Sequence, residues 1–308
     1  MSYPAANVLA GMPSLSKLYV NAAATAAKSR VLGLNSPMTL PADCNEVRGV
    51  LADLAKMTEY QHLLGKAARD VMPSGFIHAL AFPVAMSVMV REEFPLPLLG
   101  MIHLKNRVQH LAPVLFTQPV TIRSWARNLT SHRAGTQVEL VVEVRAEGSP
   151  ELLWRGVSTY LAKGIFLPGV DKPAVAGTGP DAAHGSFTPP DPTGLWHLGV
   201  DTGRAYAAVS GDFNPIHLSV LSAKALGMRR SLAHGMYLAA RVLADVGSPK
   251  PDAFSWEIAF DAPVFLPAAV AVHIADTQTD DGVWVSSQFV GWNARTGRKH
   301  FSGTAAVL

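Results

Sequence analysis

Alternation of apolar and more polar residues predicts four β-strands in each half of the chain. In the second half, Trp256, Ile258 and Phe260 alternate with more polar neighbours, and three further stretches continue the strand pattern. The first half contains four stretches of the same kind. The eight predicted strands are residues 101–109, 119–128, 136–147, 152–162, 256–261, 269–276, 283–293 and 299–308.

Two helical segments precede each run of predicted strands. A Tyr-led segment comes first, YQHLLG (60–65) in the first half and YAAVSG (206–211) in the second, and an apolar helix follows it. The apolar helix of the first half, residues 74–90, is shorter than a bilayer span and contains His78 and Pro83. We therefore predict that this helix is buried in the protein and does not cross a membrane.

The two halves share their short sequence matches in the same order. YQHLLG lies over YAAVSG at an offset of 146 residues, whereas FIHALAFPVAM (76–86) lies over LAHGMYLAARV (232–242) at an offset of 156. The second half therefore carries ten extra residues between the two matches, in a segment that includes Asp212 and His217. The shared order indicates an internal repeat.

A segment rich in proline and glycine separates the two halves. Residues 164–194 lack a hydrophobic period and are typical of a linker, so we expect an N-terminal unit (1–163) and a C-terminal unit (195–308). A helix followed by antiparallel strands buries its apolar stripe when the sheet curves around it. Each unit is therefore predicted to be α+β, with a long helix inside a curved sheet. Pairing of the two units edge to edge, as an internal pseudo-dimer, would protect their edge strands.

Composition and charge narrow the class of protein. The chain has 308 residues, 49% of them hydrophobic, which is enough for a large core. The net charge is +3 and the Lys and Arg residues are scattered, so we expect a small anionic ligand, such as a nucleotide-bearing thioester, and no nucleic acid. Cys44 is the single cysteine, which excludes an intrachain disulfide. Without a signal-peptide pattern at the N-terminus, we expect a cytoplasmic protein with no membrane span.

The segment GDFNPIH (211–217) places an acid and an imidazole at the start of a predicted helix. Asn214 suits a helix N-cap, and Pro215 suits the first turn because its φ is preset and it has no N–H. This turn would bring Asp212 and His217 together near the positive end of the helix. An acid and base pair in this position is suited to hold and deprotonate a water molecule.

The glycines around this segment have expected roles of their own. Gly211 would let a ligand or partner chain approach the backbone closely, and Gly227 is expected to end the helix that begins at Asn214. The next helix is predicted to begin at AHGM (233–236), where the first backbone amides lack partners inside the helix. The N–H of Gly235 could therefore donate to a carbonyl oxygen that acquires negative charge.

The stretch YAAVSGDFNPIHLSVLSAKALGMRRSLAHGM (206–236) resembles the signature of the MaoC-like, type 2 (R-specific) enoyl thioester hydratases and dehydratases. The whole length is also similar to mycobacterial double-hotdog 3-hydroxyacyl thioester dehydratases. The resemblance implies a double-hotdog fold and catalytic roles for Asp212 and His217. One departure is Ser219, where many members carry Asp, which leaves the contacts at the helix start open. Residues expected to bind the substrate are Gly235, Asn214, Ser210 and His234.

The resemblance also implies the reaction. It is the reversible hydration of a trans-2-enoyl thioester of coenzyme A or of acyl carrier protein to the (3R)-3-hydroxyacyl thioester, in fatty-acid metabolism and without a cofactor or metal. Asp212, favoured as the base, and His217 would hold one water, while Gly235 would bind the thioester oxygen. The first half lacks the ten extra residues, so it is expected to have no active centre. Its apolar helix would instead line a tunnel for a long acyl chain.

Structural interpretations of the same residues stay open at this point. Asp212 could simply cap a helix and His217 could be a packed histidine. His234 matches His78 in the repeat, so a packing role is as well supported as a role in the site. A metal bound by Asp212, His217 and His234 would lack the His-x-x-x-His spacing that sets two ligands on one helix face. Tyr206, matched by Tyr60, is interpreted as a packing residue.

Two other function classes also remain. A hotdog thioesterase would aim water at the carbonyl carbon, and a non-catalytic acyl-thioester-binding protein would tolerate the loss of Asp212. Lys224, Arg229 and Arg230 flank the motif, where they would meet phosphates of coenzyme A, acidic residues of an acyl carrier protein, or only solvent. A monomer and a homodimer are both compatible with the sequence.

Overall fold

The computed structural model describes residues 4–22, 39–170, 187–247 and 251–308. Its helices are α2 (Leu54–Leu63), α3 (Ser74–Met89), α4 (Thr202–Ser210), the 3₁₀ helix η2 (Pro215–His217), α5 (Val220–Ala225) and α6 (Gly235–Asp245). Its strands are β1 (Ala6–Val8), β2 (Cys44–Val50), β3 (Met101–His110), β4 (Val120–His132), β5 (Gly135–Ala146), β6 (Leu152–Lys163), β7 (Gly194–Leu198), β8 (Phe254–Phe260), β9 (Ala268–Gln278), β10 (Trp284–Asn293) and β11 (Lys299–Val307).

All eight strands predicted from alternation are present, as β3 to β6 and β8 to β11; α2 and α3 precede the first set, and α4, η2, α5 and α6 precede the second. The α+β class and the repeated order of elements are therefore confirmed. The prediction missed the three-residue strand β1, and it missed β2 and β7, which lie one ahead of the helices in each half. β2 (CNEVRGV) buries a charged residue, Glu46, which hides its alternation, and β7 (GLWHL) has only five residues.

The described chain forms two compact units. The first unit takes Met1–Leu51, Ala81–Asn106 and Gln118–Gly185, and the second takes Ala52–Leu80, Arg107–Thr117 and Ser186–Leu308. The second unit combines segments from both sides of the predicted linker. The division between the units falls inside α3, so each unit takes a part of that helix. The boundaries drawn from the sequence, and the pairing of the two hotdogs, stay predictions.

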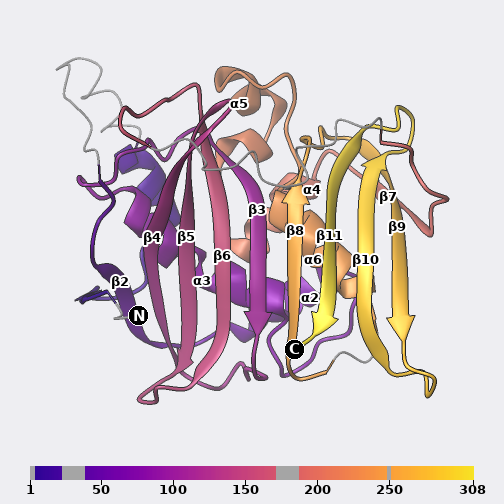
Figure 1. The fold of residues 1–308 in the computed structure, drawn as a ribbon, viewed down its shortest axis with the longest axis horizontal. Coiled ribbons are helices and arrows are strands. Elements are labelled where there is room, and N and C mark those ends of the chain that lie inside the picture. Colours follow the sequence, from indigo (N-terminus) through magenta and orange to yellow (C-terminus); the bar gives the residue numbers. More distant parts are fainter. Residues whose placement is uncertain (1–3, 23–38, 171–186, 248–250) are drawn as a thin grey trace. The chain divides into compact units, whose positions relative to one another are not determined.

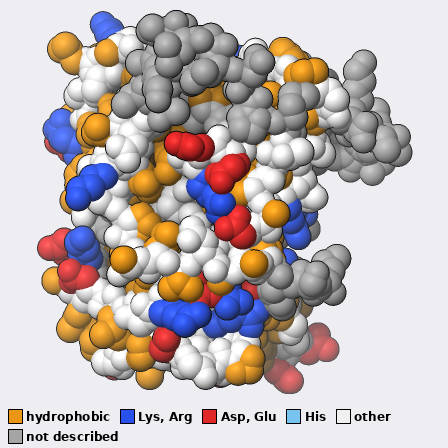
Figure 2. Space-filling model, turned by 90° about the vertical axis from the view of Figure 1, so that its left-hand side faces the viewer, with side chains coloured by type: hydrophobic (Ala, Val, Ile, Leu, Met, Phe, Trp, Pro, Cys, Tyr) orange, Lys and Arg blue, Asp and Glu red, His pale blue; other side chains and the backbone are white. Residues whose placement is uncertain are grey.

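The first unit is a sheet in the order β1-β2-β4-β5-β6-β3. Glu46 and Glu143 are fully buried in it, and each is paired with arginines. Glu46 lies opposite Arg123, Arg123 opposite Glu143, and Glu143 opposite Arg155, so the charges form a ladder across four strands. Such cross-strand pairs offset the cost of burying the two carboxylates. On the face drawn in Figure 2, basic side chains lie among acidic and hydrophobic ones instead of forming a stripe.

The second unit contains a sheet in the order β8-β11-β10-β9-β7 and the helix α6 behind it (Figure 1). Neighbouring strands in this sheet are antiparallel. The helix is amphipathic, and its inner face is buried together with large side chains of the strands. The buried residues of the helix are Met236, Tyr237, Leu238, Ala239, Ala240, Val242 and Leu243.

The apolar helix of the first half is a buried element of the protein, as predicted. It forms α3, whose 16 residues are mostly inaccessible to solvent. Among the described residues, no helix has both the length and the apolar character needed to cross a bilayer.

Two histidines in the core of the second unit make stability depend on pH. Burial lowers the pKa of His78 and of His110, each to about 4, below the ordinary value of a histidine. Both side chains are neutral when the protein is folded near neutral pH. As the pH falls below the pKa of the unfolded chain, the unfolded state binds protons that the folded state does not, so stability is lost.

We predict that acidification from about pH 6.5 to pH 5 costs about 1–2 kcal/mol for each of these histidines. Urea unfolding at a series of pH values measures this loss. The variant His78→Gln, which cannot titrate, should reduce the dependence on pH. A free energy of unfolding that stays constant over this range, or an equal slope for the variant, would contradict the prediction.

Candidate active site

The turn after α4 sets the direction of Asp212. Gly211 ends the helix with φ +77°, a left-handed conformation that favours glycine, and its N–H donates to the oxygen of Ala207 at 2.8 Å. The Ser210 hydroxyl donates to the oxygen of Tyr206 at 2.7 Å and accepts from the N–H of Asp212 at 3.3 Å. The observed role of Gly211 is therefore to form the turn that ends α4. Ser210 braces the same turn, and its expected contact with substrate stays a prediction.

Asp212 and Asn214 shape the start of η2. The Asp212 Oδ1 accepts from the N–H of Asn214 at 3.2 Å, and the Asn214 Oδ1 accepts from the N–H of Ile216 at 3.3 Å. Pro215 takes the first position of the helix. The helix start predicted at Asn214 is therefore confirmed, and Asn214 holds the turn through its side chain. One carboxylate oxygen of Asp212 is engaged in this turn.

The predicted continuous helix up to Gly227 was wrong. The chain forms η2 and then a separate helix, α5, because Ser219 is extended and caps α5 through a bond from the N–H of Ser222 to its hydroxyl at 3.0 Å. The residue that departs from the family pattern thus starts a new helix. Gly227, with φ +80°, follows the end of α5 as expected.

His217 has a defined tautomer. Its Nδ1 lies 2.9 Å from the backbone oxygen of Leu232, and a carbonyl oxygen only accepts, so Nδ1 carries the hydrogen. The Nε2 atom therefore holds a lone pair. Desolvation and the neighbouring His234 keep the pKa of His217 well below its ordinary value, against the smaller opposite effects of Asp212 and of the bond to Leu232. The ring is neutral and ready to accept a hydrogen bond.

His234 links the two predicted catalytic residues. Its Nε2 donates to the backbone oxygen of Asp212 at 3.0 Å and lies 3.8 Å from the Asp212 Oδ2. Its ring stacks on the His217 ring, with centroids 3.6 Å apart and planes at 24°. Tyr206 packs against it with centroids 5.0 Å apart. Burial lowers the pKa of His234 to about 4, so this ring is also neutral. His234 therefore positions both partners.

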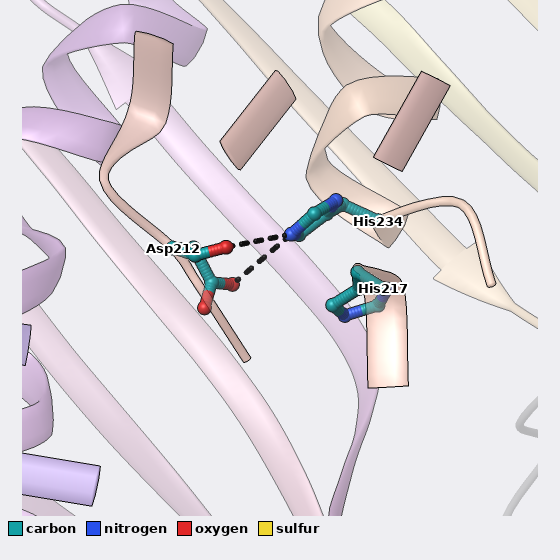
Figure 3. A group of neighbouring side chains, drawn as sticks. All are labelled: Asp212, His217 and His234. Carbon is teal, nitrogen blue, oxygen red and sulfur yellow. Dashed lines mark hydrogen bonds and ion pairs between the residues drawn. The ribbon is translucent and has the colours of Figure 1, made fainter. Parts of the chain in front are cut away.

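Asp212 and His217 face a shared space (Figure 3). The carboxylate of Asp212 and the ring of His217 lie on the same side of the His234 ring. One carboxylate oxygen and one nitrogen from each histidine all lie within 4.8 Å of one another. A water that donates two hydrogen bonds of about 2.8 Å bridges acceptors roughly 4.5 Å apart. The geometry is suited to one water held between Asp212 and His217.

The same three side chains are the described residues that could hold a metal ion. The two imidazole rings are stacked at 24°, and lone pairs that lie in two stacked planes converge poorly on one point. His217 Nδ1 and His234 Nε2 are also engaged with backbone oxygens. This arrangement favours water over a metal, and the absence of a metal stays a prediction.

Gly235 is the first residue of α6, as predicted for the oxyanion site. The first amides that bond within the helix are those of Tyr237 and Leu238, which donate to the oxygen of His234. The N–H of Gly235 precedes them and points along the positive end of the helix. A Cβ at this position would lie 3.0 Å from the ring of Phe260, so glycine allows that ring to pack closely against the start of the helix.

Gly203 was missed by the sequence analysis. It lies in α4, where a Cβ would stand 2.0 Å from the backbone oxygen of His217. Only glycine lets α4 approach the backbone of η2 this closely, so Gly203 sets the position of His217. A glycine inside a helical pattern was the available signal, but the residue that it faces lies 14 positions later in the chain.

Comparison with known proteins identifies the family of the segment that carries this site. Residues 187–290 match the protein family described as MaoC like domain, and this range contains Asp212, His217 and His234. The chain is 34% identical, over 233 residues, to 3-hydroxyacyl-thioester dehydratase X of Mycobacterium tuberculosis, with 75% of this chain and 79% of the relative covered.

Solved structures give the same result for the fold. The crystal structure of HtdX of Mycobacterium tuberculosis has a TM-score of 0.71 and 29% identity, covering 86% of this chain and all of that one. A MaoC-like dehydratase from Phytophthora capsici, 14% identical, shares the fold with a TM-score of 0.66, covering 89% of this chain and 97% of that one. The predicted double-hotdog fold is confirmed, and the chain belongs to the MaoC-like dehydratase family.

Proposed function

We propose that this protein catalyses the reversible hydration of a trans-2-enoyl thioester to the (3R)-3-hydroxyacyl thioester. The observation that carries the proposal is the close grouping of the Asp212 carboxylate with the rings of His217 and His234, in which the bond of His217 Nδ1 to Leu232 leaves Nε2 as the acceptor of that ring. The relative named as a 3-hydroxyacyl-thioester dehydratase supports the reaction class. The substrate is a thioester of coenzyme A or of acyl carrier protein, in fatty-acid metabolism, and no cofactor takes part.

The water is oriented by its own two hydrogens. One hydrogen points to Asp212 and the other to the Nε2 of His217, which leaves an oxygen lone pair free to attack carbon 3 of the enoyl group. As the C–O bond forms, Asp212 takes one proton from the water, and the π electrons of the double bond move to the thioester as an enolate. The proton then passes to carbon 2. Because the water approaches from a fixed face, one enantiomer is formed, which we propose is the R product.

The N–H of Gly235 stabilises the enolate. It lies at the positive end of α6, an 11-residue helix, where a developing negative charge is favoured. Neutral His234 contributes by position, since it holds the Asp212 backbone and supports the His217 ring. Asn214 and Ser210 maintain the turn that carries Asp212.

The remaining expectations from the sequence belong to this proposal. The N-terminal hotdog (1–163) has no active centre and leaves room for a long acyl chain along its apolar helix, while the C-terminal hotdog (195–308) is catalytic. The protein acts in the cytoplasm, as a monomer or a homodimer. Turnover limited to four-carbon thioesters would count against the acyl tunnel.

We predict that Asp212→Asn and His217→Ala each lower kcat for hydration of crotonyl-CoA by about 10²–10⁴-fold, because each removes an acceptor that orients and deprotonates the water. The assay follows the loss of ultraviolet absorbance of the conjugated enoyl thioester, with the chirality of the product determined. Asp280→Asn is the control, since Asp280 is an exposed carboxylate of the same unit.

Several outcomes would exclude this function. Wild-type protein that does not change the absorbance is not a hydratase for this substrate. Release of free thiol would instead identify a thioesterase. Full activity of either variant would show that the replaced side chain takes no part in the reaction.

We predict that Gly203→Ala lowers kcat by roughly tenfold or more while KM changes little, because a methyl group there displaces the backbone of His217 and the water with it. Gly199→Ala is the matched control, since no atom lies within 4 Å of a Cβ built at Gly199. Thermal unfolding of both variants separates a shifted site from a damaged fold. Equal kcat for the two variants would show that this close contact does not set the geometry of the site.

A further inference from the structure

The segment 213–226, which contains His217, exposes apolar side chains that the proposed chemistry does not use. Leu221 is 78% exposed, and Phe213, Leu226 and Val220 are 47%, 47% and 44% exposed. Isolated apolar residues are common on protein surfaces, whereas a group of them suits an interaction site, and these four fall within 14 consecutive positions. We call Phe213, Val220, Leu221, Lys224, Leu226 and Arg230 the α5 surface.

The charge of this region has one sign. From residue 213 to residue 244 the sequence contains no Asp or Glu, whereas Lys224, Arg229 and Arg230 are all exposed. Leu221 and Lys224 lie three residues apart on α5, so they occupy the same helix face. The α5 surface therefore combines apolar side chains with a basic border. Such a surface complements a partner that is acidic and partly apolar.

The α5 surface lies next to the residues that are proposed to act on the substrate. Asp212 directly precedes it, and His217 lies inside the same segment, two residues before the N-cap of α5. The backbone N–H of Leu232 donates to the oxygen of Ile216 at 3.0 Å, which ties the chain after α5 to η2. Figure 1 shows α5 beyond the end of β8, the first strand of its sheet. A carrier that stays on the protein surface while its acyl group reaches Asp212 would therefore contact the α5 surface.

The two candidate carriers differ in what they offer to these residues. The nucleotide phosphates of coenzyme A would engage Lys224 and Arg230 but would leave Leu221 in water. An acidic protein carrier would pair with the cations and also cover the apolar side chains, as in protein interfaces with an apolar core and a polar rim. We propose that the α5 surface docks an acyl carrier protein that presents the acyl thioester. This inference rests on the proposed function, because it names the carrier of the same substrate.

The test compares one crotonyl group on three carriers. They are a bacterial acyl carrier protein, coenzyme A and N-acetylcysteamine, which has neither protein nor phosphate. For the double variant Lys224→Glu, Arg230→Glu, kcat/KM for the protein-bound substrate should fall by about tenfold or more, mostly through KM, and the loss should shrink as salt is added. Turnover of the N-acetylcysteamine thioester should stay within about twofold of wild type.

A second variant tests the apolar part. Leu221→Ser should also weaken use of the protein-bound substrate, whereas Leu195→Ser, at a 51% exposed leucine of β7, should not. Arg295→Glu, an exposed arginine of the same unit, is the control for charge reversal. Binding of crotonyl-loaded carrier protein, measured by fluorescence anisotropy, should follow the same order without depending on turnover.

The outcomes separate this inference from the proposed function. Absence of turnover on all three carriers would refute the hydratase, while the binding experiment would still decide the docking surface. Unchanged binding and kinetics in the charge and leucine variants would overturn the docking proposal. An equal loss of kcat/KM with the coenzyme A thioester would show that Lys224 and Arg230 bind the phosphates of coenzyme A, against the docking proposal. A change of Leu221→Ser from dimer to monomer in sedimentation would show that the α5 surface joins two copies of this chain.

Discussion

The hydrogen bond from His234 to the backbone oxygen of Asp212 is the contact on which the site depends. It joins the start of α6 to the turn after α4. The same imidazole stacks on His217, whose Nδ1 is held by the backbone of Leu232. These contacts are partly buried, with the His234 side chain itself inaccessible, so the competition from water is reduced. One neutral ring therefore fixes both the carboxylate and the imidazole, and it adds no charge that would pair with Asp212.

The ten extra residues of the second half fall in the segment that carries the candidate site. This segment contains η2 and α5, which are anchored by the Asn214 cap at one end and by Gly227 at the other. α4 packs against η2 at Gly203, where the backbones of the two helices approach closely. Tyr60 and Tyr206, which match in the repeat, are both buried with ring centroids 6.1 Å apart. The two halves thus share the elements of the repeat, and the second half adds the segment that carries the candidate site.

Much of the fold was predictable because it depends on local patterns. Alternation located eight strands, and the Asn-Pro pair at 214–215 located the start of η2. The break at Ser219 was missed because a serine cap competes with helix continuation over only a few residues. The role of Gly203 and the stacking of His234 on His217 depend on segments that are distant in the sequence, and no local pattern reports them. The motif pointed to Asp212 and His217 as candidate site residues, whereas the structure identified the contacts that hold them.

The central claim is that one water bridges the Asp212 carboxylate and the Nε2 of His217. Neutron diffraction from crystals of the protein in heavy water observes this directly. The expected result is a single ordered water about 2.8 Å from both acceptors, with one deuteron directed at each, and a deuteron on Nδ1 of His217. A deuteron on the Nε2 of His217, or a direct bond between Asp212 and His217 with no water between them, would contradict the proposed mechanism.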